Sequence, residues 1–290
     1  MSILVIGATG LLGNAVFRVL HESSSVPVYG TTRKEKAKEY FLSELSNNLF
    51  VVNDIMLENE LSDLLNRISP KVIVNCASFD KETSNDPLKM INTLSIFPKR
   101  LSHLCRSHEA RLIQISSDGV FSGRKGNYTE NDLPDAYDIY GIAKWLGEVS
   151  CKNEITLRTS IIGHELYSQN GLLEWFLSQE GGCVGYKNVI FSGFPTVVLA
   201  NIIRDFVLPH TELCGVYHLA SSPITKFDLL QMIASQYNKP IKIVPDEQLV
   251  INRSLSSEKF SKETGYVAPP WPELIDMMRS YKFGLRKPNV

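Results

Sequence analysis

The first twenty residues of the chain constrain its fold more than any other segment. Ile3-Leu4-Val5-Ile6 is a short run of apolar residues, typical of a strand that is buried on both faces. Gly7-Ala8-Thr9-Gly10-Leu11-Leu12-Gly13 follows, and residues 14–20 then have the apolar spacing of a helix. A strand, a glycine turn and a helix in this order predict the first unit of a dinucleotide-binding α/β fold.

The three glycines of this turn have separate predicted roles. Gly7 permits a tight turn, Gly10 lets the backbone approach a pyrophosphate, and Gly13 lets the helix pack close to the sheet. Phosphates would then lie on unpaired amides at the helix N-terminus. The spacing is G-x-x-G-x-x-G rather than the general G-x-G-x-x-G, and the alternative is a turn that binds nothing. The predicted cofactor-binding residues here are Gly7, Thr9, Gly10, Leu11, Leu12 and Gly13.

The second strand, expected within residues 26–34, should end near the adenosine ribose of such a cofactor. Pro27 is placed at the entry of the strand, where proline is tolerated. No Asp or Glu stands at the strand end, where an NAD enzyme binds the ribose 2′-hydroxyl. Thr31, Thr32 and Arg33 stand there instead and suit a 2′-phosphate. We therefore predict NADPH, with NADH as the alternative cofactor and an exposed basic loop as the alternative structure.

Strands and helices alternate as far as residue 160, which predicts a Rossmann-type doubly wound parallel sheet. Further strands are expected at residues 49–52, 72–74, 112–115 and 155–158. Helices are expected at residues 60–68 and from Asp86-Pro87 to about Ser107, where Pro98 would introduce a kink. Ligands of such sheets bind at the carboxyl ends of the strands. The predicted cofactor contacts at these ends are Asp54, Ile55, Cys76, Ala77 and Ser78.

A tyrosine and a lysine carry the predicted chemistry. Tyr140 opens a helix that continues through Glu148, and Lys144 lies four residues further on, on the same face. A nearby ammonium would lower the high pKa of a phenol and make its proton available. Only one of the eleven tyrosines has a lysine at this spacing, which alone is weak evidence. The pair gains weight because Ser117 ends the preceding strand.

These features together resemble the extended short-chain dehydrogenase/reductase superfamily. Within it the chain is similar to the dTDP-4-dehydrorhamnose reductase family of nucleotide-sugar reductases, over nearly its whole length. The matching segments are Val5-Ile6-Gly7-Ala8-Thr9-Gly10, Val74-Asn75-Cys76-Ala77, Ser116-Ser117-Asp118-Gly119-Val120-Phe121, residues 140–148, Leu157-Arg158-Thr159-Ser160, Pro195-Thr196 and residues 215–220.

The resemblance implies a role for each catalytic residue. Tyr140 would protonate the oxygen of a sugar 4-ketone as hydride arrives from the nicotinamide. Lys144 would hold the nicotinamide ribose and depress the pKa of the tyrosine, and Ser117 would hydrogen-bond the carbonyl. The family usually has threonine at Ser117, and its rhamnose enzymes commonly have tryptophan at Ile161, so the exact sugar stays open. Tyr140 and Lys144 would also contact the cofactor.

After residue 160 the alternation of strands and helices fades. The resemblance implies a smaller substrate-binding lobe there, so we predict residues 1–160 as the NAD(P)-binding domain and residues 161–290 mainly as the lobe, with some segments returning to the first domain. Helices are expected at residues 171–178, 197–206, 226–237 and 273–281, and a strand at 216–219. Arg253 would pair with a diphosphate or be a surface arginine. The predicted substrate contacts are Ser117, Asp118, Asn92 and Arg253.

Composition excludes several other classes of protein. Thirty Lys and Arg against thirty-one Asp and Glu give a formal charge of -1 without a basic cluster, which argues against nucleic acid. No apolar run approaches the roughly 18 residues of a membrane span, and the N-terminus is not a signal peptide. Five scattered cysteines favour the cytoplasm. His103, Cys105 and His108 do not share a helix face, so no metal is predicted. His164 and His218 have no visible partner, and we assign them no role.

The leading hypothesis is an NADPH-dependent reductase of a nucleotide-linked 4-keto-6-deoxy sugar, acting as a monomer or homodimer. A second hypothesis is an epimerase or dehydratase of the same superfamily that recycles a tightly held NAD. The absence of an acid after the second strand argues against it. The third is a non-catalytic NADP-binding regulatory subunit, because the β subunit of methionine adenosyltransferase has this fold and resembles this branch.

Overall fold

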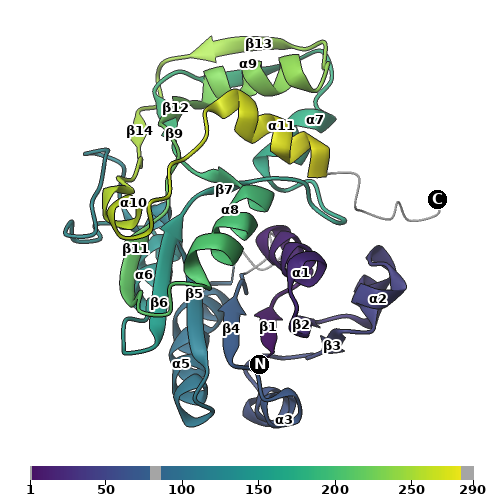
Figure 1. The fold of residues 1–290 in the computed structure, drawn as a ribbon. Helices are drawn as coiled ribbons and strands as arrows, with labels where there is room; N and C mark the ends of the chain where they lie inside the picture. Colours follow the sequence, from purple (N-terminus) through teal and green to yellow (C-terminus); the bar gives the residue numbers. More distant parts are fainter. Residues whose placement is uncertain (1, 79–85, 282–290) are drawn as a thin grey trace.

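The computed structural model describes residues 2–78 and 86–281, and a parallel sheet lies at its centre (Figure 1). Within the described residues this sheet has seven strands in the order β11-β6-β5-β4-β1-β2-β3, and all neighbouring strands are parallel. The α/β fold predicted from the sequence is therefore confirmed. The strands are β1 (Ile3–Ile6), β2 (Val28–Thr32), β3 (Leu49–Val51), β4 (Val72–Asn75), β5 (Arg111–Ser117), β6 (Glu154–Thr159) and β11 (Gly215–His218).

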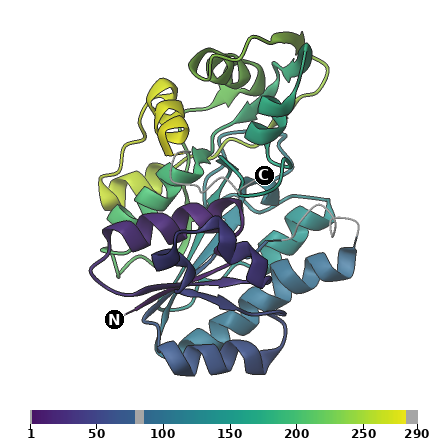
Figure 2. The ribbon, with the colours of Figure 1, turned by 90° about the vertical axis from the view of Figure 1, so that its right-hand side faces the viewer.

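Helices cover both faces of this sheet, as Figure 2 shows. On one face, Ile3 and Val5 of β1 pack in the core cluster that includes α1 (Leu11–Ser23) and α8 (Thr196–Ile202). On the other face, Leu4 and Ile6 pack with α3 (Glu58–Ile68) and α5 (Phe97–Ser107). Successive side chains of a strand point to opposite faces, so the continuous apolar run of β1 follows from burial on both sides.

The long helix that starts after Asp86 contains a π-helical turn where the sequence predicts a kink at Pro98. Asp86 caps α4 (Pro87–Ile91) by accepting a hydrogen bond from Lys89 N at 3.1 Å. The π turn η3 (Asn92–Ile96) follows, and α5 then continues the helix through Pro98. Proline has no N–H for the carbonyl four residues earlier, which is that of Leu94. A wider turn just before the proline accommodates this loss.

The rest of the described chain forms the smaller lobe and contributes some elements to the central sheet and its covering helices. The sequence predicted its helices within two residues but missed its short strands and α10. The elements are β7 (Ile161–Ile162), α7 (Leu172–Ser178), β8 (Gly182–Tyr186), β9 (Val189–Phe191), β10 (Phe194–Pro195), η5 (Ile203–Val207), β12 (Ile224–Thr225), α9 (Lys226–Gln236), β13 (Lys242–Asp246), β14 (Ile251–Asn252), α10 (Glu258–Thr264) and α11 (Trp271–Tyr281).

Two of these later segments lie against the sheet rather than in the lobe. β11 pairs with β6 from Gly215 to His218, and α8 packs against α1. The lobe itself holds small sheets, among them the parallel pair β13–β8, against which α9 packs. Among the residues that the structure describes, no helix combines the length and apolar character needed to cross a membrane.

Candidate active site

The glycine turn joins β1 to α1 at the carboxyl edge of the sheet. Gly7 has a φ of +76°, a conformation that favours glycine, and a Cβ there would lie 3.2 Å from the backbone of Ala77. The amide of Gly7 donates to Thr31 Oγ1 at 3.1 Å, and Ala8 N donates to Thr31 O at 2.9 Å. The turn is thus held between the ends of β2 and β4.

Gly10 and Gly13 differ in what a side chain would meet. A Cβ at Gly13 would lie 2.1 Å from Gly7 O, so this glycine lets α1 pack against the turn itself. A Cβ at Gly10 would lie 3.4 Å from its nearest neighbour, Gly7 O, and Gly10 is exposed. Packing of the chain therefore does not explain a glycine at position 10.

The start of α1 fits the phosphates of a dinucleotide. The first hydrogen bond of the helix runs from Asn14 N to Gly10 O at 3.0 Å, so the amides of residues 11–13 have no partner within the helix. No side chain caps these amides. Free amides at the positive end of a 13-residue helix, beside an exposed Gly10, are a suitable anion site. The residues present therefore fit the pyrophosphate of a nicotinamide cofactor.

The predicted contacts for the rest of the cofactor lie at neighbouring strand ends. Cys76 and Ala77 are half-buried after β4, and Ser78 is exposed. Asp54 is exposed and its Oδ1 accepts from Met56 N at 2.8 Å, in a turn that also contains half-buried Ile55. Arg33 is exposed directly after β2. The edge that bears the glycine turn thus carries all six predicted contacts.

The hydroxyls of Thr31 and Thr32 are used differently from the sequence prediction. Both threonines are 3% exposed. Thr31 Oγ1 accepts from Gly7, and Thr32 Oγ1 donates to Lys34 O at 3.2 Å. They shape the turn and the strand end. Of the three residues predicted to bind the 2′-phosphate, Arg33 is therefore the one that faces solvent.

Ser117, Tyr140 and Lys144 lie together where β5 meets α6 (Ile139–Leu146). Ser117 ends β5, and its side chain hydrogen-bonds that of Tyr140. Asp138 caps α6 by accepting from Gly141 N at 2.9 Å, which fixes the start of the helix at the tyrosine. Lys144 is 8% exposed and donates to Ile115 O of β5 at 3.3 Å. The structure thus places a hydroxyl, a phenol and an amine at one strand end.

Glycines allow this close packing. A Cβ at Gly119 would lie 2.8 Å from the ring of Tyr140, and one at Gly141 would lie 2.3 Å from Gly119 O. Tyr140 also packs beside Met90, Leu94 and Ala143. The phenol is therefore held from two sides.

The direction of the tyrosine's pKa differs from the sequence prediction. Burial raises the pKa of Tyr140, and the carboxylates of Asp118 and Asp138 raise it further, although Ser117 and Arg253 act in the opposite direction. Burial also lowers the pKa of Lys144 to about 8, against the effect of Cys76 and Glu148. The expected depression of the phenol by Lys144 is therefore outweighed, and Tyr140 holds its proton at neutral pH.

Asp118 faces cations that come from the lobe. Burial raises the pKa of its carboxyl to about 6, while Ser117, Arg253, Ser160 and Lys226 lower it. Arg253 follows β14 and lies 3.9 Å from Asp138, between Nη2 and Oδ2. Lys226 opens α9, and sequence reasoning missed it because a lysine at a helix start carries no distinguishing motif. The structure thus brings two cations toward Asp118.

Asn92 begins η3, the turn that packs against α6, and it is exposed. Met90 and Leu94, two residues to either side, are buried near the tyrosine.

A buried ion pair lies just after α6, at Glu148. Arg158 Nε and Nη2 donate to the two oxygens of Glu148 at 2.7 and 2.8 Å, and Ser116 Oγ donates to the same carboxylate at 2.8 Å. His218 Nε2 lies 3.2 Å from Arg158 Nη1. Burial and Arg158 lower the pKa of His218 to about 3. A guanidinium that pairs with both oxygens of a carboxylate fixes the relative orientation of the two side chains as well as neutralising their charges.

The prediction that His164 and His218 lack partners was wrong. His218 Nδ1 lies 3.0 Å from Tyr128 O, in addition to its contact with Arg158. His164 joins Glu174 of α7 at 2.5 Å and Tyr237 of the segment after α9 at 3.0 Å. These partners come from residues far along the chain, where no local pattern could indicate them.

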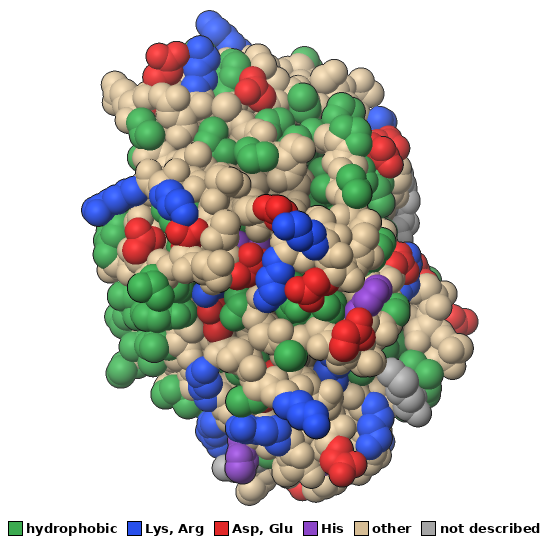
Figure 3. Space-filling view, turned by 60° about the vertical axis from the view of Figure 1, so that its left-hand side comes forward, with side chains coloured by type: hydrophobic (Ala, Val, Ile, Leu, Met, Phe, Trp, Pro, Cys, Tyr) green, Lys and Arg blue, Asp and Glu red, His purple; other side chains and the backbone are tan. Residues whose placement is uncertain are grey.

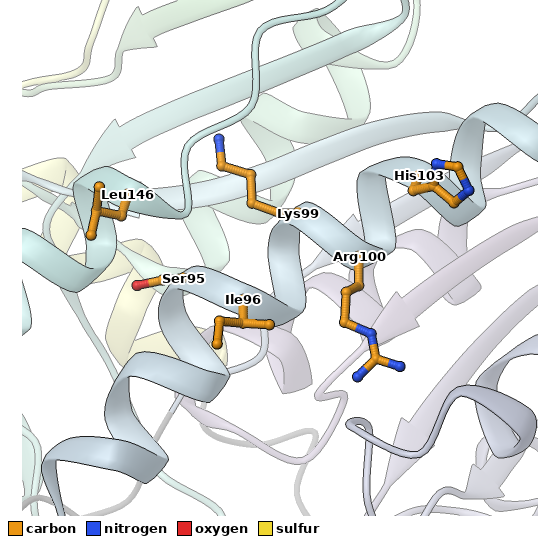
Figure 4. Close-up of a pocket in the computed structure, with 6 residues that line it drawn as sticks. All are labelled: Ser95, Ile96, Lys99, Arg100, His103 and Leu146. Atoms are coloured by element: carbon orange, nitrogen blue, oxygen red, sulfur yellow. The ribbon is translucent and has the colours of Figure 1, made fainter.

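A groove of about 580 Å³ lies on the outer face of η3, α5 and α6, and we assign it no role. Figure 3 shows a face of the molecule on which hydrophobic, basic and acidic side chains are interspersed. Lys99 and Arg100 of the groove point in different directions, as Figure 4 shows. Lys99 donates to Glu148 O, and Arg100 Nη1 donates to Met56 O at 2.9 Å. Lys99 and Arg100 therefore do not converge on a common binding site in the groove.

The fold and the site define a class of protein. A parallel nucleotide-binding sheet, a glycine turn with free helix amides, and a strand-end serine beside a Tyr-x-x-x-Lys helix are the features of an extended short-chain dehydrogenase/reductase. The chain belongs to the family described as RmlD substrate binding domain, which matches residues 1–280.

Comparison with known proteins gives two sets of relatives. The chain is 25% identical over 316 residues to methionine adenosyltransferase 2 subunit beta of Mus musculus, across 94% of this chain and 88% of that protein. It is 28% identical over 260 residues to the protein of the same name from Danio rerio, across 82% of this chain and 74% of that one.

The solved structures share the fold. A dTDP-4-dehydrorhamnose reductase of Clostridium acetobutylicum has a TM-score of 0.79 at 19% identity, over 98% of this chain and 100% of that chain. The reductase of that name from Bacillus anthracis, in complex with NADP, has a TM-score of 0.77 at 20% identity, over 97% and 99%. A Bordetella bronchiseptica enzyme, WbmG, in complex with NAD has a TM-score of 0.78 at 15% identity, over 98% and 95%. Structural relatives thus bind NADP or NAD.

Proposed function

We propose that this protein is an NADPH-dependent reductase of a nucleotide-linked 4-keto-6-deoxy sugar. The observation that carries the proposal is the hydrogen bond between Ser117 and Tyr140, at a strand end that Lys144 also reaches. A hydroxyl and a protonated phenol side by side can hold a carbonyl oxygen and give it a proton.

The bound cofactor would supply hydride to the carbonyl carbon. Residues 7–13 would hold its pyrophosphate on free amides, and Arg33 would pair with a 2′-phosphate. Ser117 would donate a hydrogen bond to the substrate carbonyl, and Tyr140 would transfer its phenolic proton to that oxygen. Lys144, buried with its pKa near 8, would hydrogen-bond the nicotinamide ribose. The raised pKa of Tyr140 supports this direction of reaction, because a proton donor must be protonated at working pH.

Charges of the lobe support a nucleotide-linked substrate. Arg253 and Lys226 both lie close enough to Asp118 to lower the pKa of its carboxyl. They would pair with the diphosphate while Asp118 accepts hydrogen bonds from sugar hydroxyls. The structural likeness to dTDP-4-dehydrorhamnose reductases supports a sugar of this class.

The test is the oxidation of NADPH in the presence of dTDP-, UDP- and GDP-linked 4-keto sugars, followed by cofactor absorbance. Tyr140→Phe should lose at least ~100-fold in kcat, because it removes the proton donor. It should bind NADPH within about twofold of wild type, since a single peripheral hydrogen bond is a small part of cofactor affinity. Equal turnover by both proteins would remove Tyr140 from the mechanism.

A second candidate function is a cofactor-binding regulatory subunit. The observation in its favour is the match to the methionine adenosyltransferase 2 subunit beta proteins, over most of both chains. The two candidates differ in a direct assay. Turnover of a keto sugar that depends on Tyr140 supports the reductase. NADPH binding without turnover, together with a stable complex with a methionine adenosyltransferase catalytic subunit, supports the regulatory subunit.

A further inference from the structure

Ser117 is the middle member of a chain of three hydrogen-bonding side chains. Its Oγ donates to Asp118 Oδ1 at 3.2 Å and accepts from Gly119 N at 3.0 Å. It also hydrogen-bonds Tyr140. A serine hydroxyl has one proton and two acceptor positions, so Ser117 can donate to Asp118 or to Tyr140 in turn while it accepts from Gly119 N and from the other side chain. The phenol of Tyr140 is thereby connected to the carboxyl of Asp118 through one hydroxyl.

The far end of this chain can hold a proton. Asp118 is half-buried, and its carboxyl faces Ser160 after β6, Lys226 at the start of α9 and Arg253 after β14, as well as Ser117 and, further off, Tyr140. Burial raises the pKa of this carboxyl to about 6 in spite of the two cations. An ordinary aspartic acid has lost its proton well below that pH. Near pH 6, Asp118 is both an available acid and an available base.

We propose that Asp118 returns a proton to Tyr140 through the hydroxyl of Ser117 after each reduction. This inference rests on the proposed reductase function. With hydride delivered to the carbonyl carbon, Tyr140 gives its proton to the carbonyl oxygen and becomes a phenolate, and the ketone becomes an alcohol. Ser117 then gives its hydroxyl proton to the phenolate and takes the proton of the Asp118 carboxylic acid. Water reprotonates the carboxylate. Asp118 is in this respect a positioning residue, because it acts through Ser117.

The variant Asp118→Asn tests the route, because an amide oxygen still accepts from Ser117 but the group cannot hold a titrating proton. In the first turnover Tyr140 already carries its proton, so at saturating substrate the single-turnover rate of Asp118→Asn should fall by a much smaller factor than its steady-state kcat, whatever the change does to substrate affinity. Steady-state kcat at pH 6 should fall by at least ~10-fold. In wild type, kcat should decline as pH rises through about 6, and the variant should lose this limb. Asp205→Asn, an exposed partner of Arg204, is the matched control.

Three results would overturn the route. If Asp118→Asn lowers the first-turnover and steady-state rates by the same factor, the residue acts in binding or chemistry alone. If the variant keeps the wild-type pH limb, another group titrates. An unchanged kcat would show that Tyr140 regains its proton elsewhere.

A measurement without substrate separates this inference from the proposed function. The charge of Asp118 raises the pKa of Tyr140, so Asp118→Asn should let the phenol ionise at lower pH. The signal is the phenolate absorbance that Tyr140→Phe removes, compared in the two backgrounds. A protein without turnover but with this coupling contradicts the reductase and retains the chain of hydrogen bonds. Identical titration in both backgrounds contradicts the chain itself, whatever the turnover.

Discussion

Gly10 and Gly13 lack a side chain for different reasons, and the difference can be measured. A Cβ at Gly13 would lie 2.1 Å from a backbone oxygen, whereas one at Gly10 would meet its nearest atom at 3.4 Å. Gly13→Ala should therefore lower the free energy of unfolding by about 2–3 kcal/mol through overpacking. Gly10→Ala should cost about 1 kcal/mol or less, the loss of glycine at an N-cap position.

Although Gly10→Ala should cost less stability than Gly13→Ala, it should weaken cofactor binding more. Gly10→Ala places a methyl group where the pyrophosphate is expected, so the Kd for NADPH should rise at least ~10-fold, or about 1.4 kcal/mol. Urea unfolding and NADPH fluorescence titration measure the two quantities. If Gly10→Ala binds NADPH as wild type does, the phosphates do not approach this position.

The carboxyl of Asp118 gives a pH-dependent stability with a definite sign. Its pKa is about 6 in the folded protein, against about 3.9 in an unfolded chain. Between these values the folded protein binds more protons, so stability falls as pH rises through this window. Asp118→Asn should be more stable than wild type at pH 7.5 by about 1–2 kcal/mol, less than the full shift because the group is partly exposed. The advantage should vanish near pH 4, as urea unfolding at several pH values would show; a constant difference contradicts it.

Residue patterns predicted the site where the chemistry is local. Tyr140 and Lys144 share a helix face, and Ser117 ends the strand before them, so spacing alone brings them close. The pKa of Tyr140 could not be predicted this way, because burial and the charges of Asp118 and Asp138 decide it. Lys226 could not be predicted either, because it comes from a helix more than eighty residues further along the chain. Local pattern finds the donors, and long-range packing sets their protonation.

At the scale of elements, the catalytic helix depends on the π turn beside it. A Cβ at Gly147, just after α6, would lie 1.8 Å from Leu94 O and 3.3 Å from Pro98 Cγ. Leu94 is also the residue whose carbonyl Pro98 cannot pair. The approach of α6 to η3 thus requires a glycine at position 147.

Gly147→Ala should therefore disturb the active site from outside it. We expect a loss of about 3 kcal/mol in the free energy of unfolding, since backbone rather than a flexible side chain must move. Turnover should fall further than stability explains, because Tyr140 and Lys144 move with α6. Ile142→Ala, on an exposed position of the same helix, should stay within about 0.5 kcal/mol of wild type. Full activity in a folded Gly147→Ala protein would show that α6 does not need this contact.

The elements of the lobe show where sequence patterns end. α7 and α9 have helical spacing over seven and eleven residues and were predicted. β12 and β14 are two residues long, and they are strands only because both pair with β9. A period of two cannot be recognised over two residues. Such strands depend on partners elsewhere in the chain, which a single sequence does not reveal.

At the scale of the whole molecule, the first 160 residues do not contain all that their sheet needs. β11 pairs along β6, and α8 packs on α1, so both complete layers begun far earlier in the chain. The buried guanidinium of Arg111 donates to the carbonyls of Val207, His210 and Leu213 at 2.7, 2.9 and 3.2 Å. These contacts tie the start of β5 to the segment that leads into β11.

A fragment of residues 1–160 should therefore fail to fold cooperatively. The fragment would leave β6 as an unprotected edge and would uncover the apolar face of α1. It would also remove the three carbonyls that accept hydrogen bonds from the Arg111 guanidinium. The whole chain should unfold in urea in one transition, because the later segments belong to the same core. The fragment should give a broad, non-cooperative change and no NADPH binding. A sigmoidal transition with retained NADPH binding would instead make residues 1–160 an independent domain, with β11 and α8 as additions to a sheet that is already stable.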